Sequence, residues 1–156
     1  MKNYIDYINK NKKVIEKTLD IDNKKWEENV NFDDLIKEDK IEVEFEKEKT
    51  YLVIYEGQPE ITKQLIEKAI NTKSNLILTI KDYYLATNTA FVSIANKYIE
   101  ENNIIMLFKL YNNINDNKIY EATTKADKTL YIGDLSDFNF IKNNIQNEVL
   151  FIEYND

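Results

Sequence analysis

The sequence predicts an α/β fold, a Rossmann-like, doubly wound and mostly parallel sheet of about five strands with an added N-terminal helix and an acidic edge strand. Five short apolar runs recur from residue 50 onward, and amphipathic helical patterns separate them. Apolar strands that alternate with helices are typical of a parallel sheet covered on both faces. The chain has 156 residues, 43% of them hydrophobic, and we expect a single α/β domain over 1–156.

Residues 1–49 are expected to form the additions to this core. Residues 1–19 have the apolar spacing of one amphipathic helix, and residues 20–39 form an acidic loop or short helix. Residues 41–46 alternate strictly, which predicts a half-buried strand. Its apolar side consists of Ile41, Val43 and Phe45, and its outward side of Glu42, Glu44 and Glu46. An outward row of glutamates would also protect an exposed sheet edge from pairing with other chains.

Residues 50–156 are expected to form the Rossmann-like core. The predicted strands cover 51–55, 76–80, 104–111, 129–132 and 149–154, and helical patterns cover 61–70, 90–99, 119–126 and 138–145. Pro59 follows Gly57 at a predicted strand-to-helix turn and would begin the next helix. Gly133 and Asp134 would turn the chain before Ser136 caps the last helix.

The composition argues against several kinds of chemistry. The sequence contains no cysteine and no histidine, and all 21 of its basic residues are lysine. We therefore expect no disulfide, no catalytic residue, no metal site and no bound cofactor, and a non-enzymatic protein. The absence of cysteine suits a reducing compartment, and the longest apolar run is too short to span a membrane. A cytoplasmic protein without membrane contact is expected.

The negative charge is concentrated in one window. Residues 27–48 hold ten acidic residues and three lysines, which accounts for the whole net charge of -7. This composition argues against direct nucleic-acid binding, which depends on clustered basic residues. It is typical either of a solvated face or of a surface that meets a basic partner. The predicted partner-binding residues are Asp33, Asp34, Glu38, Asp39, Glu42, Glu44, Glu46 and Glu48.

The carboxyl ends of the predicted strands are the other place where a site is expected, because ligands of open α/β sheets bind there. The residues at these ends are Glu56, Gly57, Gln58, Lys81, Asp82, Asn112, Gly133 and Asp134. Glu56 and Asp134 could form a pair of carboxylates for acid–base chemistry or for a hard cation. Ordinary turn and capping roles explain the same residues more simply.

Three stretches resemble the cofactor-binding domain of the aldehyde dehydrogenase superfamily, and the gamma-glutamyl phosphate reductase branch looks most similar. They are Val53 to Thr62 (VIYEGQPEIT), Ala69 to Leu78 (AINTKSNLIL) and Asn88 to Val92 (NTAFV). The resemblance covers about residues 50–154 and implies a nucleotide site at the strand ends. The chain departs from that family because it lacks the catalytic cysteine and has only two glycines. It would then be a truncated and degenerate relic without dehydrogenase activity.

Two functions follow from these observations. The favoured one is a non-catalytic protein-binding module, an acidic inhibitor or regulator of the anti-CRISPR or immunity type that engages a basic, nucleic-acid-handling protein. The alternative is a nucleotide-binding or small-ligand-binding relic of an aldehyde dehydrogenase-like cofactor domain. Burial of Trp26 and the acidic strand in a homodimer would convert the predicted interaction surface into a structural interface.

Overall fold

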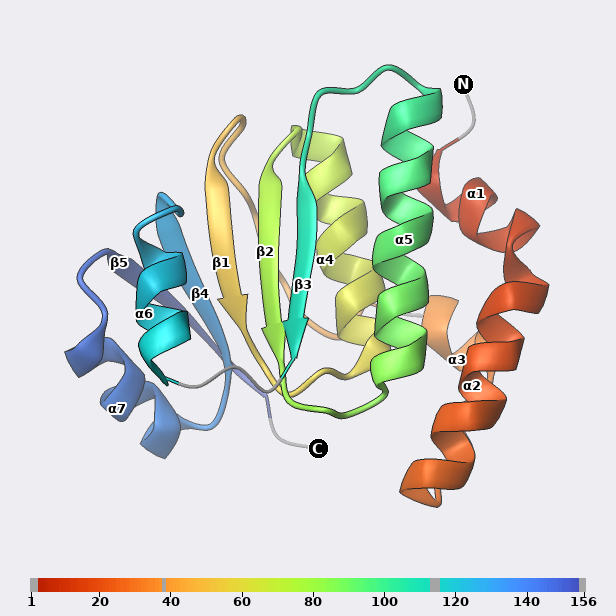
Figure 1. Cartoon of the computed structure of the whole chain (residues 1–156), viewed down its shortest axis with the longest axis horizontal. Coiled ribbons are helices and arrows are strands. Elements are labelled where there is room, and N and C mark those ends of the chain that lie inside the picture. Colours follow the sequence, from red (N-terminus) through yellow and green to blue (C-terminus); the bar gives the residue numbers. More distant parts are fainter. Residues whose placement is uncertain (1–2, 38, 113–115, 155–156) are drawn as a thin grey trace.

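The central element is a five-stranded, entirely parallel sheet, seen in a computed structural model that describes residues 3–37, 39–112 and 116–154 (Figure 1). Its strands are β1 (Thr50–Ile54), β2 (Asn75–Ile80), β3 (Phe108–Asn112), β4 (Lys128–Gly133) and β5 (Glu148–Glu153), and their order is β3-β2-β1-β4-β5. The predicted Rossmann-like, doubly wound class is therefore confirmed. After β3 the chain returns to the other side of β1, so the winding direction reverses between β1 and β4.

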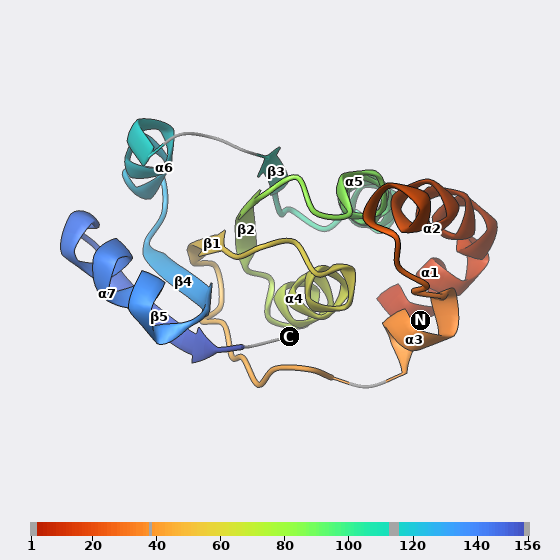
Figure 2. The ribbon, with the colours of Figure 1, turned by 90° about the horizontal axis from the view of Figure 1, so that it is seen from below.

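Helices cover both faces of the sheet (Figure 2). Helices α4 (Pro59–Thr72) and α5 (Leu85–Glu101) lie on one face, and α6 (Asp116–Thr123) and α7 (Leu135–Asn144) lie on the other. The central strands are buried on both sides, as the residues of β1 from Tyr51 to Val53 illustrate. The expected helix start at Pro59 is confirmed, because Pro59 occupies the first turn of α4.

Three N-terminal helices form a further layer outside α4 and α5 (Figure 2). They are α1 (Tyr4–Lys10), α2 (Lys12–Trp26) and α3 (Phe32–Ile36). The single helix predicted over residues 1–19 is wrong in two respects, because the chain breaks at Asn11 and the second helix runs on to Trp26. The Asn11 side chain donates to the Tyr7 carbonyl at 2.8 Å, and such a local bond competes with helix continuation.

The acidic edge strand predicted at residues 41–46 is absent, because this segment has no regular secondary structure and pairs with no strand of the described sheet. Its burial still alternates, with Ile41 and Phe45 buried and the glutamates exposed. The segment lies against α4, where Gln64 Oε1 accepts from the Lys40 and Ile41 amides at 2.8 and 3.1 Å and Gln64 Nε2 donates to the Ile41 carbonyl. A helix side chain thus satisfies the backbone groups that a neighbouring strand was expected to satisfy.

The strand predicted at 104–111 begins later than expected. Strand β3 starts at Phe108, which is the register partner of Leu76 near the start of β2. Residues 104–107 precede the paired register. Leu107 is held by two single bonds, because its amide donates to Asn75 Oδ1 at 2.8 Å and its carbonyl accepts from the Leu76 amide at 3.1 Å, whereas Ile105 is 99% exposed. No helix within the described residues combines the length and apolar character needed to cross a bilayer.

Candidate functional site

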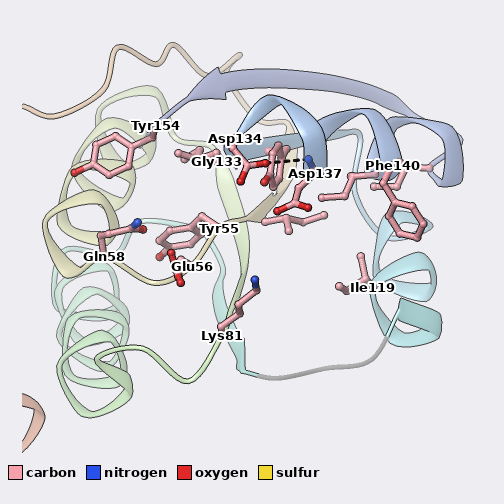
Figure 3. A pocket seen from close by; sticks show the side chains of 15 residues that line it. Tyr55, Glu56, Gln58, Lys81, Ile119, Gly133, Asp134, Asp137, Phe140 and Tyr154 are labelled. Atoms are coloured by element: carbon pink, nitrogen blue, oxygen red, sulfur yellow. Dashed lines mark hydrogen bonds between the residues drawn. The ribbon is translucent and has the colours of Figure 1, made fainter. Parts of the chain in front are cut away.

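A cavity of about 540 Å³ lies at the carboxyl ends of β1 and β4, where the winding direction of the sheet reverses (Figure 3). Helices α6 and α7 contribute its apolar wall, through Ile119 from α6 and Phe140 and Ile141 from α7. Other lining residues come from the strand ends, the turn before α4 and Tyr154 after β5. In parallel α/β sheets this reversal point is where ligands bind, because the two adjacent connections leave on opposite faces.

The turn that borders the cavity depends on a glycine. Gly57 has φ +121°, and a Cβ at this position would lie 2.7 Å from the Tyr83 carbonyl oxygen. Asn88 Nδ2 donates to the carbonyls of Gly57, Tyr83 and Tyr84 at 2.7, 3.1 and 3.0 Å. Residue 57 therefore requires glycine for its backbone conformation and for this close approach.

Buried hydroxyl groups continue this network beneath the cavity. Thr62 Oγ1 donates to Asn88 Oδ1 and contacts the hydroxyl of Tyr55. Burial raises the pKa of Tyr55 well above its ordinary value, so its hydroxyl stays protonated. The network fixes the positions of Glu56 and Gln58 at the rim, because the residues on either side of them are held.

Asp134 marks the start of α7 at the opposite rim. Its Oδ1 accepts from the Asp137 amide and from the Ser136 hydroxyl, both at 2.9 Å. The predicted capping by Ser136 is wrong, since Asp134 is the N-cap and Ser136 donates to it. The Asp137 amide, the Ser136 hydroxyl and the charge of Lys81 lower the pKa of Asp134, which is therefore ionised at neutral pH.

Tyr131 forms part of the cavity wall from β4. Burial, with the nearby charges of Asp137 and Asp134, raises its pKa to about 12. Its hydroxyl covers the Cα of Gly133, so any side chain at residue 133 would collide with it. Its ring is nearly parallel to the ring of Phe151, its register partner on β5, with a centroid separation of 6.0 Å. The β4 wall of the cavity is therefore aromatic.

Five of the eight strand-end residues predicted from the sequence line the cavity: Glu56, Gln58, Lys81, Gly133 and Asp134. Gly57 supports the turn beside it, whereas Asp82 pairs with Lys25 at 2.5 Å and Asn112 lies in a groove beside α5. The wall residues Ile119, Tyr131, Phe140 and Tyr154 were missed. In the sequence they read as ordinary core positions, and only Asp137, one helical turn after Asp134, gave a local signal.

The arrangement of metal-binding side chains does not support the hypothesis that Glu56 and Asp134 hold a cation. Among the residues that the structure describes, no three histidine, cysteine or carboxylate side chains are grouped as metal ligands would be. Lys81 instead lies between the two rims, with its amine directed toward the cavity (Figure 3).

The described acidic residues that were predicted to bind a partner lie on α3 and on the segment before β1, away from this cavity. Several have structural roles: Asp34 forms a capping box with Asn31, and Glu46 pairs with Lys128 at 2.6 Å. Asp39 Oδ2 lies 4.0 Å from Lys68 Nζ, and Glu38 is outside the described residues. The remaining described members, Asp33, Glu42, Glu44 and Glu48, are exposed. Their contact with a basic partner, or with a second copy of the chain, stays a prediction.

Two solved structures that are similar to this chain are universal stress proteins. A crystal structure of a universal stress protein in complex with cAMP has 14% identity and a TM-score of 0.44, and the match covers 70% of this chain and 99% of that one. A universal stress family protein from Burkholderia pseudomallei has 13% identity and a TM-score of 0.43, with 67% and 95% covered. No protein-family model matches the sequence, and no curated protein matches it significantly.

These findings correct two interpretations of the sequence. The similar structures are universal stress proteins, so the assignment to the aldehyde dehydrogenase superfamily, and with it the idea of a truncated relic, is wrong. The quoted stretches contain a strand-to-helix turn with Gly57 and Pro59, which many parallel α/β folds need for the same steric reasons. The interpretation as an acidic inhibitor of the anti-CRISPR or immunity type is overturned by the same structures, and the acidic strand on which it relied does not form.

Proposed function

We propose that the chain is a binding protein for a small nucleoside-type ligand, held in the cavity between the ends of β1 and β4. The observation that carries the proposal is a cavity of about 540 Å³ at the reversal point of the sheet. This volume is typical of small-molecule sites, which cover about 300–1,000 Å³. Its position supports the proposal independently, because it follows from the topology and not from a motif.

The inner part of the cavity suits a planar ring. Ile54, Ile119, Ile141 and Ile145 supply apolar surface, and Phe140 supplies an aromatic face at the open end. Phe140 is 59% exposed, which leaves its ring accessible to a ligand. Stacking of a base on an aromatic side chain contributes about 1–3 kcal/mol.

The rim suits hydroxyl and amino donors better than phosphates. Glu56, Asp134 and Asp137 are hydrogen-bond acceptors, and Lys81 is the cation among the described lining residues. The lining is therefore net negative, and a triphosphate would be repelled. Phosphate cradles also need several glycines, and the sequence has only Gly57 and Gly133. A nucleoside, or a nucleotide with a single negative charge, is the better match.

The proposal is one of binding without catalysis. The sequence contains no histidine, the most frequent general base, and no cysteine, a frequent nucleophile. Residence in the cytoplasm, proposed from the absence of cysteine, agrees with the supply of free nucleosides and nucleotides there.

Thermal denaturation with a ligand series tests the proposal. Adenosine, guanosine, cytidine and cAMP at millimolar concentration should raise the melting temperature, because a ligand that binds only the folded state stabilises it. ATP should give a smaller shift than adenosine, because the carboxylates repel its phosphates. No shift with any nucleoside, or a shift with ATP alone, would contradict the proposal.

Two truncations to alanine on helix α7 test where the ligand binds. Phe140→Ala should weaken binding of the responding nucleoside about tenfold, which corresponds to the loss of about 1.4 kcal/mol of stacking. Leu135→Ala is the matched control, because Leu135 is similarly exposed on α7, at 55%, but does not line the cavity. Calorimetric titration measures the affinity of each variant for the nucleoside. An equal loss of affinity in the two variants would show that the ligand does not stack on Phe140.

A further inference from the structure

A second cavity, of about 170 Å³, lies between α6 and the strands β2 and β3. Lys109 and Tyr111 line it from β3, where their spacing of two residues places both on the face of the sheet that α6 covers. Ile77, the register partner of Lys109 on β2, provides a buried apolar floor. The opposite wall comes from α6 and the turn that follows it.

The charge of this cavity is opposite to that of the whole chain. Lys109, Lys118 and Lys125 line it together with Glu121, which leaves two positive charges in a protein of net charge -7. Lys118 pairs with Glu121 at 3.6 Å. Within the described residues Lys109 and Lys125 form no ion pair, so their charges are available to a ligand.

We propose that this cavity binds the phosphate group of a small organic phosphate. A phosphate monoester carries close to two negative charges at neutral pH, which matches the two net positive charges of the lining. Lysine ammonium groups bind phosphate as point charges, so the site needs no glycine loop. The ring of Tyr111 and the side chain of Ile77 would contact the organic part of the ligand.

The two cavities differ in the ligands that they would accept, although both lie on the α6 side of the sheet. The cavity at the ends of β1 and β4 has three carboxylates against Lys81, and the lysine-lined cavity has the reverse balance. Ile119 faces the first, and Lys118 beside it faces the second. The second proposal therefore does not depend on nucleoside binding.

Amide chemical-shift titration of the labelled protein tests the site, with phenyl phosphate, inorganic phosphate and phenol as probes. Phenyl phosphate at low ionic strength should shift the amides of Lys109, Ala122 and Lys125 in a saturable way. Inorganic phosphate should bind more weakly, because it lacks the apolar part, and phenol more weakly still, because it lacks the charge. The amides around Asp134 should respond to adenosine and not to phenyl phosphate, so the two proposals can fail separately.

Charge reversal decides between a specific site and general attraction. The double variant Lys109→Glu with Lys125→Glu should weaken phenyl phosphate binding at least about tenfold. The control Lys13→Glu with Lys17→Glu on α2 alters the net charge equally at exposed positions far from the cavity and should change affinity less than about twofold. If the glutamate variant does not fold, Lys109→Gln with Lys125→Gln replaces it. Absence of saturable shifts around the cavity, or equal losses in the two pairs, would overturn the proposal.

Discussion

Asp22 shows how a single buried residue can complete a helix that lies far away in the sequence. Helix α5 begins after Tyr84, which has φ 51° and provides no side-chain cap. Asp22 of α2 replaces that cap, because its Oδ2 accepts from the Thr87 amide at 2.8 Å and from the Thr87 hydroxyl at 2.6 Å. The side chain is only 2% exposed, so water cannot take over these bonds.

Replacement of Asp22 should therefore be costly. We expect Asp22→Ala to lower the free energy of unfolding by about 1–3 kcal/mol, because it leaves buried donors at the start of α5 without an acceptor. Asp20→Ala, at an exposed position on the same helix, should change stability by less than about 0.5 kcal/mol. Urea denaturation of both variants gives the comparison, and similar values would show that Asp22 does not stabilise α5.

At the scale of elements, the segment at residues 39–46 packs against α4, although the sequence predicted a strand at the edge of the sheet for residues 41–46. Gln64 on α4 is fully buried and bonds to both backbone groups of Ile41. Ser74 adds a second attachment by donating to the Glu46 carbonyl at 2.8 Å, and the Glu46 amide donates to the Tyr51 hydroxyl, also at 2.8 Å. Side chains thus hold this segment in place, although it pairs with no strand of the described sheet.

Gln64→Leu should release the segment while keeping the volume of the side chain similar. The amides of Lys40 and Ile41 should then exchange with solvent at least about tenfold faster, and stability should fall by about 1–3 kcal/mol, because the Ile41 backbone groups lose their partners. Asn71→Leu on the same helix is the exposed control. Hydrogen exchange followed by NMR measures the effect, and unchanged protection at Ile41 would mean that Gln64 does not hold the segment.

At the scale of the whole molecule, the two faces of the sheet are unequal. The face covered by α4 and α5 is buried again by α1, α2 and α3, whereas α6 and α7 form a single layer (Figure 2). Helix α7 has no fully buried residue, and both proposed binding cavities lie on this thinner side. Binding sites thus occur where the helical layer leaves the sheet incompletely filled.

Buried tyrosines should limit the stability of the whole molecule in alkali. Burial raises the pKa of Tyr84 and of Tyr131 to about 12, from an ordinary value of 10.0. As the pH rises, the unfolded chain therefore loses these hydroxyl protons before the folded protein does. The contribution of the two tyrosines to the free energy of unfolding is fully present below about pH 10 and is lost as the pH rises toward about 12. Each unit of difference corresponds to about 1.4 kcal/mol.

Urea denaturation between about pH 9 and about pH 11.5 measures this loss. Tyr131→Phe should make the decline of stability with pH shallower, whereas Tyr111→Phe, at a 40% exposed position on β3, should leave the decline as in the unaltered protein. Parallel declines in all three proteins would show that Tyr131 does not contribute to the alkaline transition.

The sequence alone determined the elements whose signals are local. The strands β1, β2, β4 and β5 and the helices α4 and α5 follow from apolar runs and helical spacing, and the start of α4 follows from Gly57 and Pro59. The rim residues Glu56, Lys81 and Asp134 could be named because the carboxyl ends of parallel strands meet at one edge.

Only the tertiary structure showed which neighbours these elements pack against. Alternation at residues 41–46 reported one buried side and one exposed side, but it could not distinguish a strand partner from the side chain of Gln64. The Asp22 cap, the aromatic wall around Tyr131 and the lysine-lined cavity join residues that are far apart in the chain. Periodicity records which side of an element is buried, whereas the neighbour that buries it is set by packing over long distances in the sequence.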